Sequence, residues 1–256
     1  EDMKVVISIG GSVLARELNP EKFKSYASML KELSKKNAVF VVTGGGRAAR
    51  DYINVARGLG ADEATCDILG IEITRINARL LIAALGESAY HEPPLDYEQA
   101  KRASLSGRIV VMGGVAAGQT TDAVSAVLSE YIGADLLINA TSTDGVYTSD
   151  PKKNNDARKF ETMTPGQLIE IVMKTEMVAG ANSPIDLLAA KIIERSNIKT
   201  IVLNGESPQS IFDAVYDKHT GTVIEKNRAR AGSKEKDDAE KDPCNLGYFS
   251  TNGCDS

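Results

Sequence analysis

The sequence contains few cysteines and histidines, and this shortage limits the chemistry that the chain can perform. It has three cysteines, Cys66, Cys244 and Cys254, and two histidines, His91 and His219. No Cys/His cluster has the spacing of zinc ligands, and the two histidines are far apart in the sequence. We therefore expect neither a protein-held metal site nor a histidine-based catalytic centre. Cys66 is interpreted as a small buried apolar group.

Long apolar runs and an excess of basic residues are absent as well. No apolar run approaches the roughly 18 residues that a membrane-spanning helix needs. The net charge is −5, from 30 Lys and Arg against 35 Asp and Glu, whereas nucleic-acid binding needs clustered basic residues. The first residues, Glu1 to Lys4, lead into a predicted strand without the pattern of a signal peptide. We expect a cytoplasmic protein that binds neither nucleic acid nor membranes.

The sequence does contain a regular alternation of apolar runs and helical patterns. Apolar runs typical of buried strands occupy residues 4–9, 38–42, 109–112, 135–140, 200–204 and, more briefly, 221–224. Helical spacing covers residues 20–35, 47–53, 63–85, 97–104, 123–128, 165–174, 186–196 and 210–216. This order predicts an α/β fold with a mostly parallel, doubly wound sheet covered by helices on both faces.

Three of the predicted strands end in glycine turns that lead towards helices. These turns are Gly10-Gly11-Ser12, Gly44-Gly45-Gly46 and Gly113-Gly114. Glycines let backbone N–H groups approach an anion closely, and a helix N-terminus adds a partial positive charge. One such turn could be a plain strand-to-helix connection. Three in one chain favour an anion-binding edge of the sheet.

Charged residues near these turns are further candidates for the site. Arg47 and Arg50 lie three residues apart on one helix face and could reach an oxyanion, Arg50 being favoured. The alternative is that both are solvated surface charges. Asp67 could accept hydrogen bonds from sugar hydroxyls, or it could be a simple helix-terminus charge. Asp122 stands where a helix begins, which suits capping rather than catalysis.

The segment 141–151 is dense in hydroxyl and carboxylate groups, with Asp144-Gly145 as a turn. It would suit the ribose, the base edge and the metal-bound phosphates of a nucleotide, because Asp144 and Asp150 carry oxygen donors of the kind that Mg²⁺ prefers. A polar surface hairpin is the alternative. The small, polar linker 179–183 could form another backbone turn near a ligand.

The ordered set of these motifs resembles the amino acid kinase superfamily, most closely its archaeal-type uridylate (UMP) kinases. The resemblance runs from about Met3 to Glu225. It implies a three-layer α/β/α sandwich around a mainly parallel central sheet, in one domain over 1–225 whose ATP-binding part begins near 135. It implies Mg²⁺-dependent phosphoryl transfer from ATP to UMP, in pyrimidine biosynthesis. It also implies a homohexamer, built as a trimer of dimers through the helix near Asp67.

The resemblance assigns roles to individual residues. For UMP these are Gly45, Asp67, Val115, Ala116, Ala117, Gly118, Gln119, Thr120 and Thr121. For ATP and the transferred phosphate they are Gly11, Ser12, Gly46, Arg50, Thr141, Ser142, Tyr147 and Asp150. Arg50, Ser12 and Lys191 are the candidate catalytic residues, although Lys191 could equally be a surface residue of its helix.

Two departures from the family pattern leave alternatives open. Ser8 stands where many members of the superfamily have a lysine, and Ser142 stands where the archaeal-type kinases usually have asparagine. The missing lysine favours a nucleotide-binding storage or regulatory protein that does not turn over. A kinase for acyl or isoprenoid phosphates is a further alternative, against which Asp67 and the loop through Gln119 to Thr121 count.

Residues 226–256 do not fit the family. This tail is polar and has too little apolar content to fold alone, so we expect it to be disordered and assign it no function. A disulfide between Cys244 and Cys254 is possible only under oxidising conditions.

Overall fold

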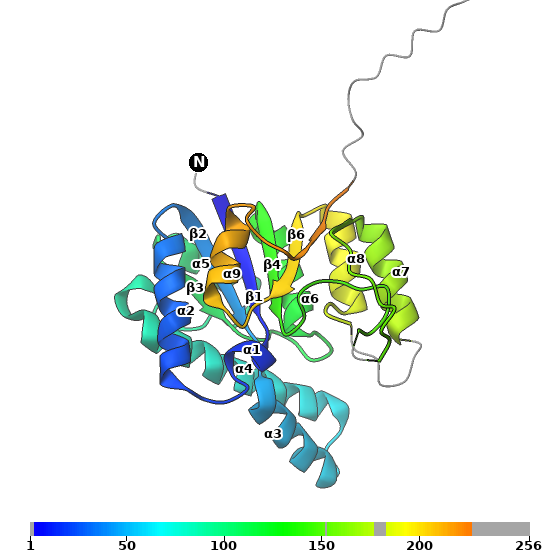
Figure 1. The fold of residues 1–256 in the computed structure, drawn as a ribbon. Helices are drawn as coiled ribbons and strands as arrows, with labels where there is room; N and C mark the ends of the chain where they lie inside the picture. Colours follow the sequence, from blue (N-terminus) through cyan, green and yellow to red (C-terminus); the bar gives the residue numbers. More distant parts are fainter. Residues whose placement is uncertain (1–2, 152, 177–182, 227–256) are drawn as a thin grey trace, which may run out of the picture. The chain divides into compact units, whose positions relative to one another are not determined.

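The structure is a computed structural model that describes residues 3–151, 153–176 and 183–226 (Figure 1). The chain up to Lys226 forms one compact unit. The expectations for residues 179–182 and for 227–256, including Cys244 and Cys254, lie outside the described residues. Cys66 is buried, with 1% of its surface exposed, as expected.

The core of the unit is a seven-stranded sheet with the order β3-β2-β1-β4-β6-β7-β5. The strands are β1 (Met3–Ile9), β2 (Asn37–Thr43), β3 (Val110–Met112), β4 (Leu136–Thr141), β5 (Thr162–Met163), β6 (Thr200–Asn204) and β7 (Thr222–Ile224). Among the described pairs, only β6 and β7 are antiparallel. The expectation of a mainly parallel sheet is confirmed.

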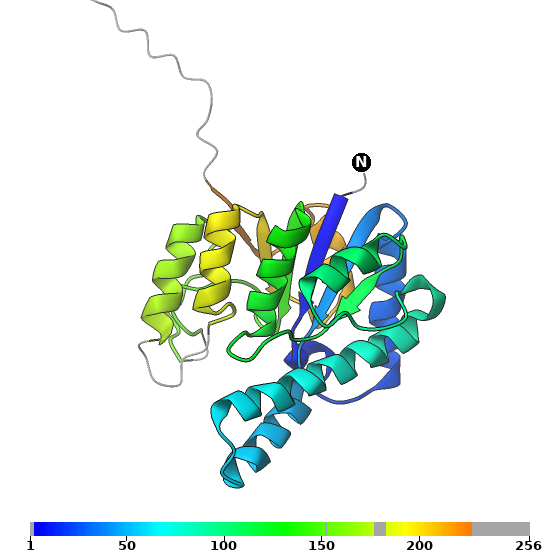
Figure 2. The same ribbon diagram turned by 180° about the vertical axis from the view of Figure 1, so that it is seen from behind.

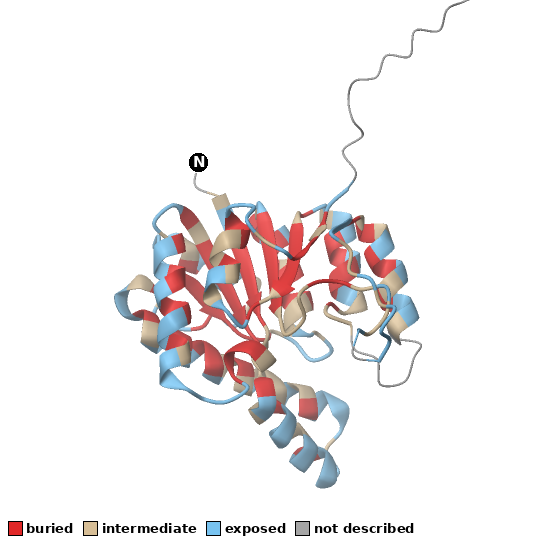
Figure 3. Ribbon diagram, viewed as in Figure 1, coloured by how far each residue is buried: buried red, intermediate tan, exposed pale blue. Residues whose placement is uncertain are grey.

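Helices cover both faces of the sheet (Figures 1 and 2). One face carries α2 (Pro20–Leu33), the C-terminal half of α4 (Glu63–Leu85) and α9 (Pro208–Val215). The other face carries α5 (Tyr97–Ser104), α6 (Thr121–Ile132), α7 (Pro165–Glu176) and α8 (Leu187–Ser196). Figure 3 shows the buried residues concentrated in the strands and on the inward helix faces. The expected three-layer α/β/α arrangement is therefore present.

Three helices lie at the carboxyl ends of the parallel strands. The turn after β1 forms α1 (Gly11–Leu14), and the turn after β2 opens α3 (Gly46–Gly58). In Figure 1, α3 and the first half of α4 extend beyond this edge of the sheet. A single 3₁₀ turn, η1 (Gly86–Ser88), follows α4. Within the part of the chain that the structure describes, no helix is long and apolar enough to cross a membrane.

Side-chain caps explain why several helices begin where they do. Asp62, Asp96 and Asp186 accept hydrogen bonds from the backbone N–H three residues later, at 2.7–3.0 Å. At α6 the cap is Thr120, whose hydroxyl accepts from Ala123 N at 3.1 Å. The expectation that Asp122 suits capping is wrong, because Thr120 has the extended backbone of an N-cap and Asp122 already lies within the helix.

The apolar residues of α4 do not all face the core. Ile68, Ile76 and Leu80 are 53%, 51% and 40% exposed. Thr74 and Asn77 are instead buried, at 7% and 2%. The inward face of α4 is therefore partly polar, and its outward face carries much of the apolar surface.

Candidate functional site

The first two glycine turns contact each other backbone to backbone. Gly44 N donates to Ile9 O at 3.0 Å. A Cβ atom on Gly11 would lie only 2.0 Å from Gly46 N, and one on Gly44 would lie 2.2 Å from Gly11 N. This approach is possible only because both positions lack side chains. It brings the N-terminus of α3, whose first amides have no partner within the helix, against the turn after β1.

The third glycine turn is held by α4. Gly114 N donates to Thr74 Oγ1 at 2.7 Å, and Arg75 Nε donates to Gly114 O at 3.2 Å. A Cβ on Gly113 would lie 2.5 Å from Thr74 Oγ1, so this position also requires glycine. The loop that follows therefore starts from a fixed point on α4.

A hollow of about 380 Å³ lies between α3, α4 and this loop. That volume falls within the range of small-molecule sites, about 300–1,000 Å³. Its lining combines residues expected to bind UMP with others from α3, α4 and the turn after β3: Gly45, Asp67, Gly118, Gln119, Thr120 and Thr121, with Gly46, Ala49, Ile53, Gly70, Ile71, Thr74 and Gly114. We call it the acceptor hollow.

Hydrogen bonds fix the loop that borders the acceptor hollow. Asp67 Oδ2 accepts from Gly118 N at 2.8 Å, and Tyr97 OH donates to Gln119 Oε1 at 3.0 Å. Gly118 has a φ of +78°, which glycine adopts without strain. Val115 packs instead against the apolar cluster on the α6 side of the sheet, and Ala116 and Ala117 are exposed. These three residues belong to the loop but do not line the hollow.

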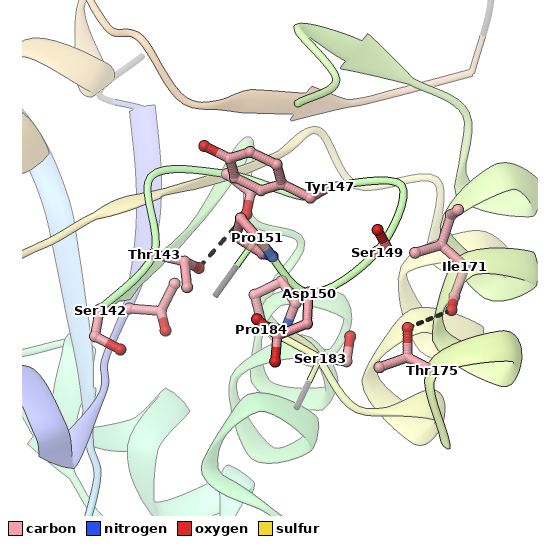
Figure 4. A pocket seen from close by; sticks show the side chains of 12 residues that line it. Ser142, Thr143, Tyr147, Ser149, Asp150, Pro151, Ile171, Thr175, Ser183 and Pro184 are labelled. Carbon is pink, nitrogen blue, oxygen red and sulfur yellow. Dashed lines mark hydrogen bonds between the residues drawn. The ribbon is translucent and has the colours of Figure 1, made fainter. Parts of the chain in front are cut away.

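A second hollow, of about 150 Å³, lies beyond the carboxyl end of β4 (Figure 4). Its wall contains the four residues of the segment 141–151 that are expected to bind ATP, together with other residues of that segment and of the α7–α8 region: Thr141, Ser142, Tyr147 and Asp150, with Thr143, Gly145, Ser149, Pro151, Ile171, Thr175, Ser183 and Pro184. We call it the nucleotide hollow. Most residues of the segment 141–151 therefore border a cavity, as a nucleotide-binding role requires.

Asp144 is engaged by its neighbours rather than aimed into the nucleotide hollow. It accepts hydrogen bonds from Tyr147 OH at 2.7 Å and from Lys159 Nζ at 3.1 Å. Burial opposes its ionisation, but these two hydrogen bonds, the positive charge of Lys159 and a backbone hydrogen bond together lower the pKa of Asp144. Over the described ranges, no group of three or more His, Cys, Asp or Glu side chains is arranged to hold a metal ion.

The N-termini of α6 and α8 are linked beside the two hollows. Thr120 donates its hydroxyl to Asp186, which also caps α8. Asp122, partly buried next to them, accepts from Ser8 Oγ at 3.2 Å. Burial and the nearby Asp186 carboxylate raise the pKa of Asp122 to about 7, although hydrogen bonds from Ser8 and Asn139 partly offset this shift.

The candidate catalytic residues lie in different surroundings. Ser12 is half-buried in the first turn of α1. Arg50 is exposed one turn after the start of α3 and makes no ion pair with another described residue, whereas Arg47 pairs with Asp51 at 3.5 Å. Lys191 is exposed on α8 and is not among the residues that line either hollow. The catalytic roles of all three remain predictions.

The main residues that the sequence did not reveal are Thr74 and Asn77. Asn77 Nδ2 donates to the carbonyl oxygens of Gly44 and Gly45, at 2.8 and 3.2 Å. The available signal was the presence of two polar residues three positions apart within an otherwise apolar helix. The apolar residues around them concealed which face of α4 points inward.

Comparisons with known proteins agree with this geometry. Residues 3–204 match the amino acid kinase family. The chain is 56% identical over 228 residues to a uridylate kinase of Methanococcoides burtonii, covering 87% of this chain and 97% of that protein. It is 54% identical to a uridylate kinase of Halobacterium salinarum, covering 87% and 93%. The crystal structure of a uridylate kinase from Archaeoglobus fulgidus superposes with a TM-score of 0.80 at 50% identity, covering 87% of this chain and all of that one.

Proposed function

The chain belongs to the amino acid kinase family, and we propose that it is a kinase that transfers the γ-phosphoryl group of ATP to UMP. The products are ADP and UDP. The relatives named uridylate kinase are 54% and 56% identical and are covered almost completely by this chain. Such identity over the whole domain supports the same reaction, in pyrimidine nucleotide biosynthesis in the cytoplasm.

One observation carries the proposal, namely the strand order at the carboxyl edge of the sheet. β1 lies between β2 and β4. The turn Gly10–Ser12 after β1 therefore lies between the acceptor hollow, which includes the turn after β2, and the nucleotide hollow, which starts at the end of β4. In open α/β sheets, ligands bind outside the carboxyl ends of the strands. Two nucleotides placed end to end would meet with their phosphates at Gly10–Ser12.

The acceptor hollow suits a nucleoside monophosphate. We place its phosphate at Gly45 and Gly46, where the first amides of α3 supply hydrogen bonds and partial positive charge. Its ribose lies at Asp67 and its base along the part of the loop that lines the hollow, Gly118 to Thr121. Gly46, which is expected at the transferred phosphate, also lines this hollow, so it would contact the phosphate of UMP as well.

The nucleotide hollow receives ATP, which enters as its Mg²⁺ complex. Phosphoryl transfer needs little covalent help, because positioning and charge neutralisation provide most of the catalysis. Arg50 supplies a mobile cation, and the backbone amides around Gly11 and Ser12 supply fixed donors. Lys191 is a second candidate cation, from α8. Thr141, Ser142, Tyr147 and Asp150 hold the nucleoside part.

The serine at position 8 favours a second candidate function. The carboxylate of Asp122 accepts a hydrogen bond from Ser8 and forms no ion pair with another described residue. A storage or regulatory protein would bind nucleotides here without transferring phosphate. The identity to uridylate kinases opposes this alternative, and turnover decides between the two.

We also propose that the chain assembles as a homohexamer of three dimers, each formed through α4. The support is the apolar surface that α4 leaves exposed at Ile68, Ile76 and Leu80. Large exposed apolar residues that recur along one helix are typical of a surface that packs against a partner. Light scattering of the wild-type protein and of Ile76→Asp tests this point, because the charge should reduce the assembly to a smaller species.

The experiment that tests the reaction measures ADP release with MgATP and one acceptor at a time. We expect rapid release with UMP, at least roughly tenfold slower release with CMP and AMP, and none with small carboxylates. Nucleotide binding without UMP-dependent ADP release would favour the storage alternative.

A further inference from the structure

We propose that Thr74 and Asn77 of α4 are positioning residues that hold the second and third glycine turns in the conformation that binds the acceptor phosphate and nucleoside. This inference rests on the proposed function. It assigns α4 a role in the acceptor hollow beyond the contact of Asp67 with the loop.

Asn77 fixes the orientation of the peptide groups in the second turn. Its Nδ2 donates to the carbonyl oxygens of both Gly44 and Gly45. In a trans peptide unit, the C=O and the following N–H point in opposite directions. The peptide bonds of this turn are trans, so the N–H groups of Gly45 and Gly46 point away from Asn77. Fixing the carbonyls of this turn therefore fixes two amide donors at the rim of the acceptor hollow.

Thr74 joins three elements at the wall of the hollow. Its hydroxyl accepts from Gly114 N at 2.7 Å and donates to Ile71 O at 2.6 Å within α4. Its carbonyl accepts from Thr43 Oγ1, at the end of β2, at 2.9 Å. Thr74 thus holds the third turn on α4, and Asn77, three residues further along the same helix, holds the second turn.

The two contacts act on the acceptor side of the site. Thr74 and Asn77 are almost fully buried, and each uses its polar atoms on the backbone of a glycine turn. No side-chain hydrogen bond between α4 and the residues of the nucleotide hollow is found within the described ranges. Loss of the Thr74 contact should therefore weaken binding of UMP and leave binding of ATP nearly unchanged. Loss of the Asn77 contact should weaken binding of UMP as well, but it also acts on Gly46, which is expected at the transferred phosphate.

The test compares Thr74→Val with Thr74→Ser. Valine has nearly the shape of threonine but cannot accept the hydrogen bond from Gly114 N, whereas serine keeps the hydroxyl. We expect Thr74→Val to raise the Kd of UMP, by calorimetry, and the KM of UMP about tenfold, the effect of one hydrogen bond. The KM of ATP should stay within about twofold of wild type. Thr74→Ser should restore the wild-type KM of UMP.

A second position and a control make the test independent of simple loss of stability. Asn77→Leu removes both hydrogen bonds to the second turn and should raise the Kd and the KM of UMP in the same way. Ser129→Ala is the matched control, because Ser129 is fully buried and donates only to Ser125 O, inside α6, at 2.7 Å. It should lower the thermal midpoint without changing the KM of either nucleotide.

The outcomes separate this inference from the proposed function. Unchanged UMP affinity in both Thr74→Val and Asn77→Leu would overturn the positioning role while leaving the kinase intact. Equal increases in the KM of UMP and ATP in Thr74→Val would also overturn it, since they would indicate a general structural effect. Failure of the wild-type protein to bind UMP would overturn both.

Discussion

Ser8 donates a hydrogen bond of 3.2 Å to Asp122 Oδ1, from the position where many members of the superfamily carry a lysine. A hydroxyl can satisfy one carboxylate oxygen, but it cannot neutralise the charge. Burial and the neighbouring Asp186 then raise the pKa of Asp122 to about 7. With a serine at this position, the carboxyl group of Asp122 has a charge that depends on pH in the neutral range.

The first prediction concerns Asp122→Asn and the pH dependence of stability. The pKa of Asp122 rises from 3.8, the ordinary value, to about 7 in the folded chain. Between these values the folded state binds more protons than the unfolded state, so the wild type loses stability as the pH rises from 4 to 7. The neutral amide of the variant removes this loss.

We expect Asp122→Asn to be more stable than wild type by about 1–2 kcal/mol at pH 8, with little difference near pH 4. Urea unfolding at both pH values measures this. A variant less stable than wild type at pH 8 would contradict the prediction, because it would show that the charged carboxylate stabilises the fold.

The second prediction concerns the contact between the first two glycine turns. Gly11→Ala places a Cβ 2.0 Å from Gly46 N, so the two backbones must separate. We expect a loss of about 1–3 kcal/mol in stability and a large fall in turnover. Thermal unfolding and ADP release measure the two effects.

Gly58→Ala is the control for that substitution. A Cβ on Gly58, the last residue of α3, would meet no atom within 4 Å. Alanine favours the helix by up to about 1 kcal/mol, so this variant should be as stable as wild type or more so. Equal behaviour of the two variants would mean that the turns tolerate separation.

The third prediction separates the two arginines of α3. Arg50→Ala should lower turnover by about a hundredfold or more, because it removes a cation from the transferred phosphate. Arg47→Ala should have little effect, since Arg47 already pairs with Asp51 on the surface. Steady-state rates at saturating UMP and MgATP measure both. Near-wild-type turnover of Arg50→Ala would remove Arg50 from the phosphate site.

Most of the fold could be predicted from the sequence because its signals are local. The expected helices 63–85 and 97–104 coincide with α4 and α5, since apolar spacing and the caps Asp62 and Asp96 define them. The three glycine turns could also be located from the sequence, because each follows an apolar run, and the structure places them after β1, β2 and β3. The strand β5 was not predicted, because two residues are too few to show alternation.

The site was less predictable where side-chain direction matters. Thr120 and Asp122 both suit a helix start by residue type, and only the backbone conformation shows that Thr120 caps and Asp122 turns towards β1. Likewise, the choice of which face of α4 is buried depends on the glycine turns beside it. Those turns need polar partners, which explains why Asn77 points inward and Ile76 outward.

The central claim is that phosphate passes from ATP to UMP on this chain, and following a labelled γ-phosphate tests it most directly. The wild-type protein is incubated with Mg²⁺, γ-labelled ATP and UMP, and the nucleotides are separated. We expect the label to appear in the β-phosphate of UDP, in amounts equal to the ADP formed. Label found only in ATP, or released as inorganic phosphate with UMP unchanged, would contradict the claim.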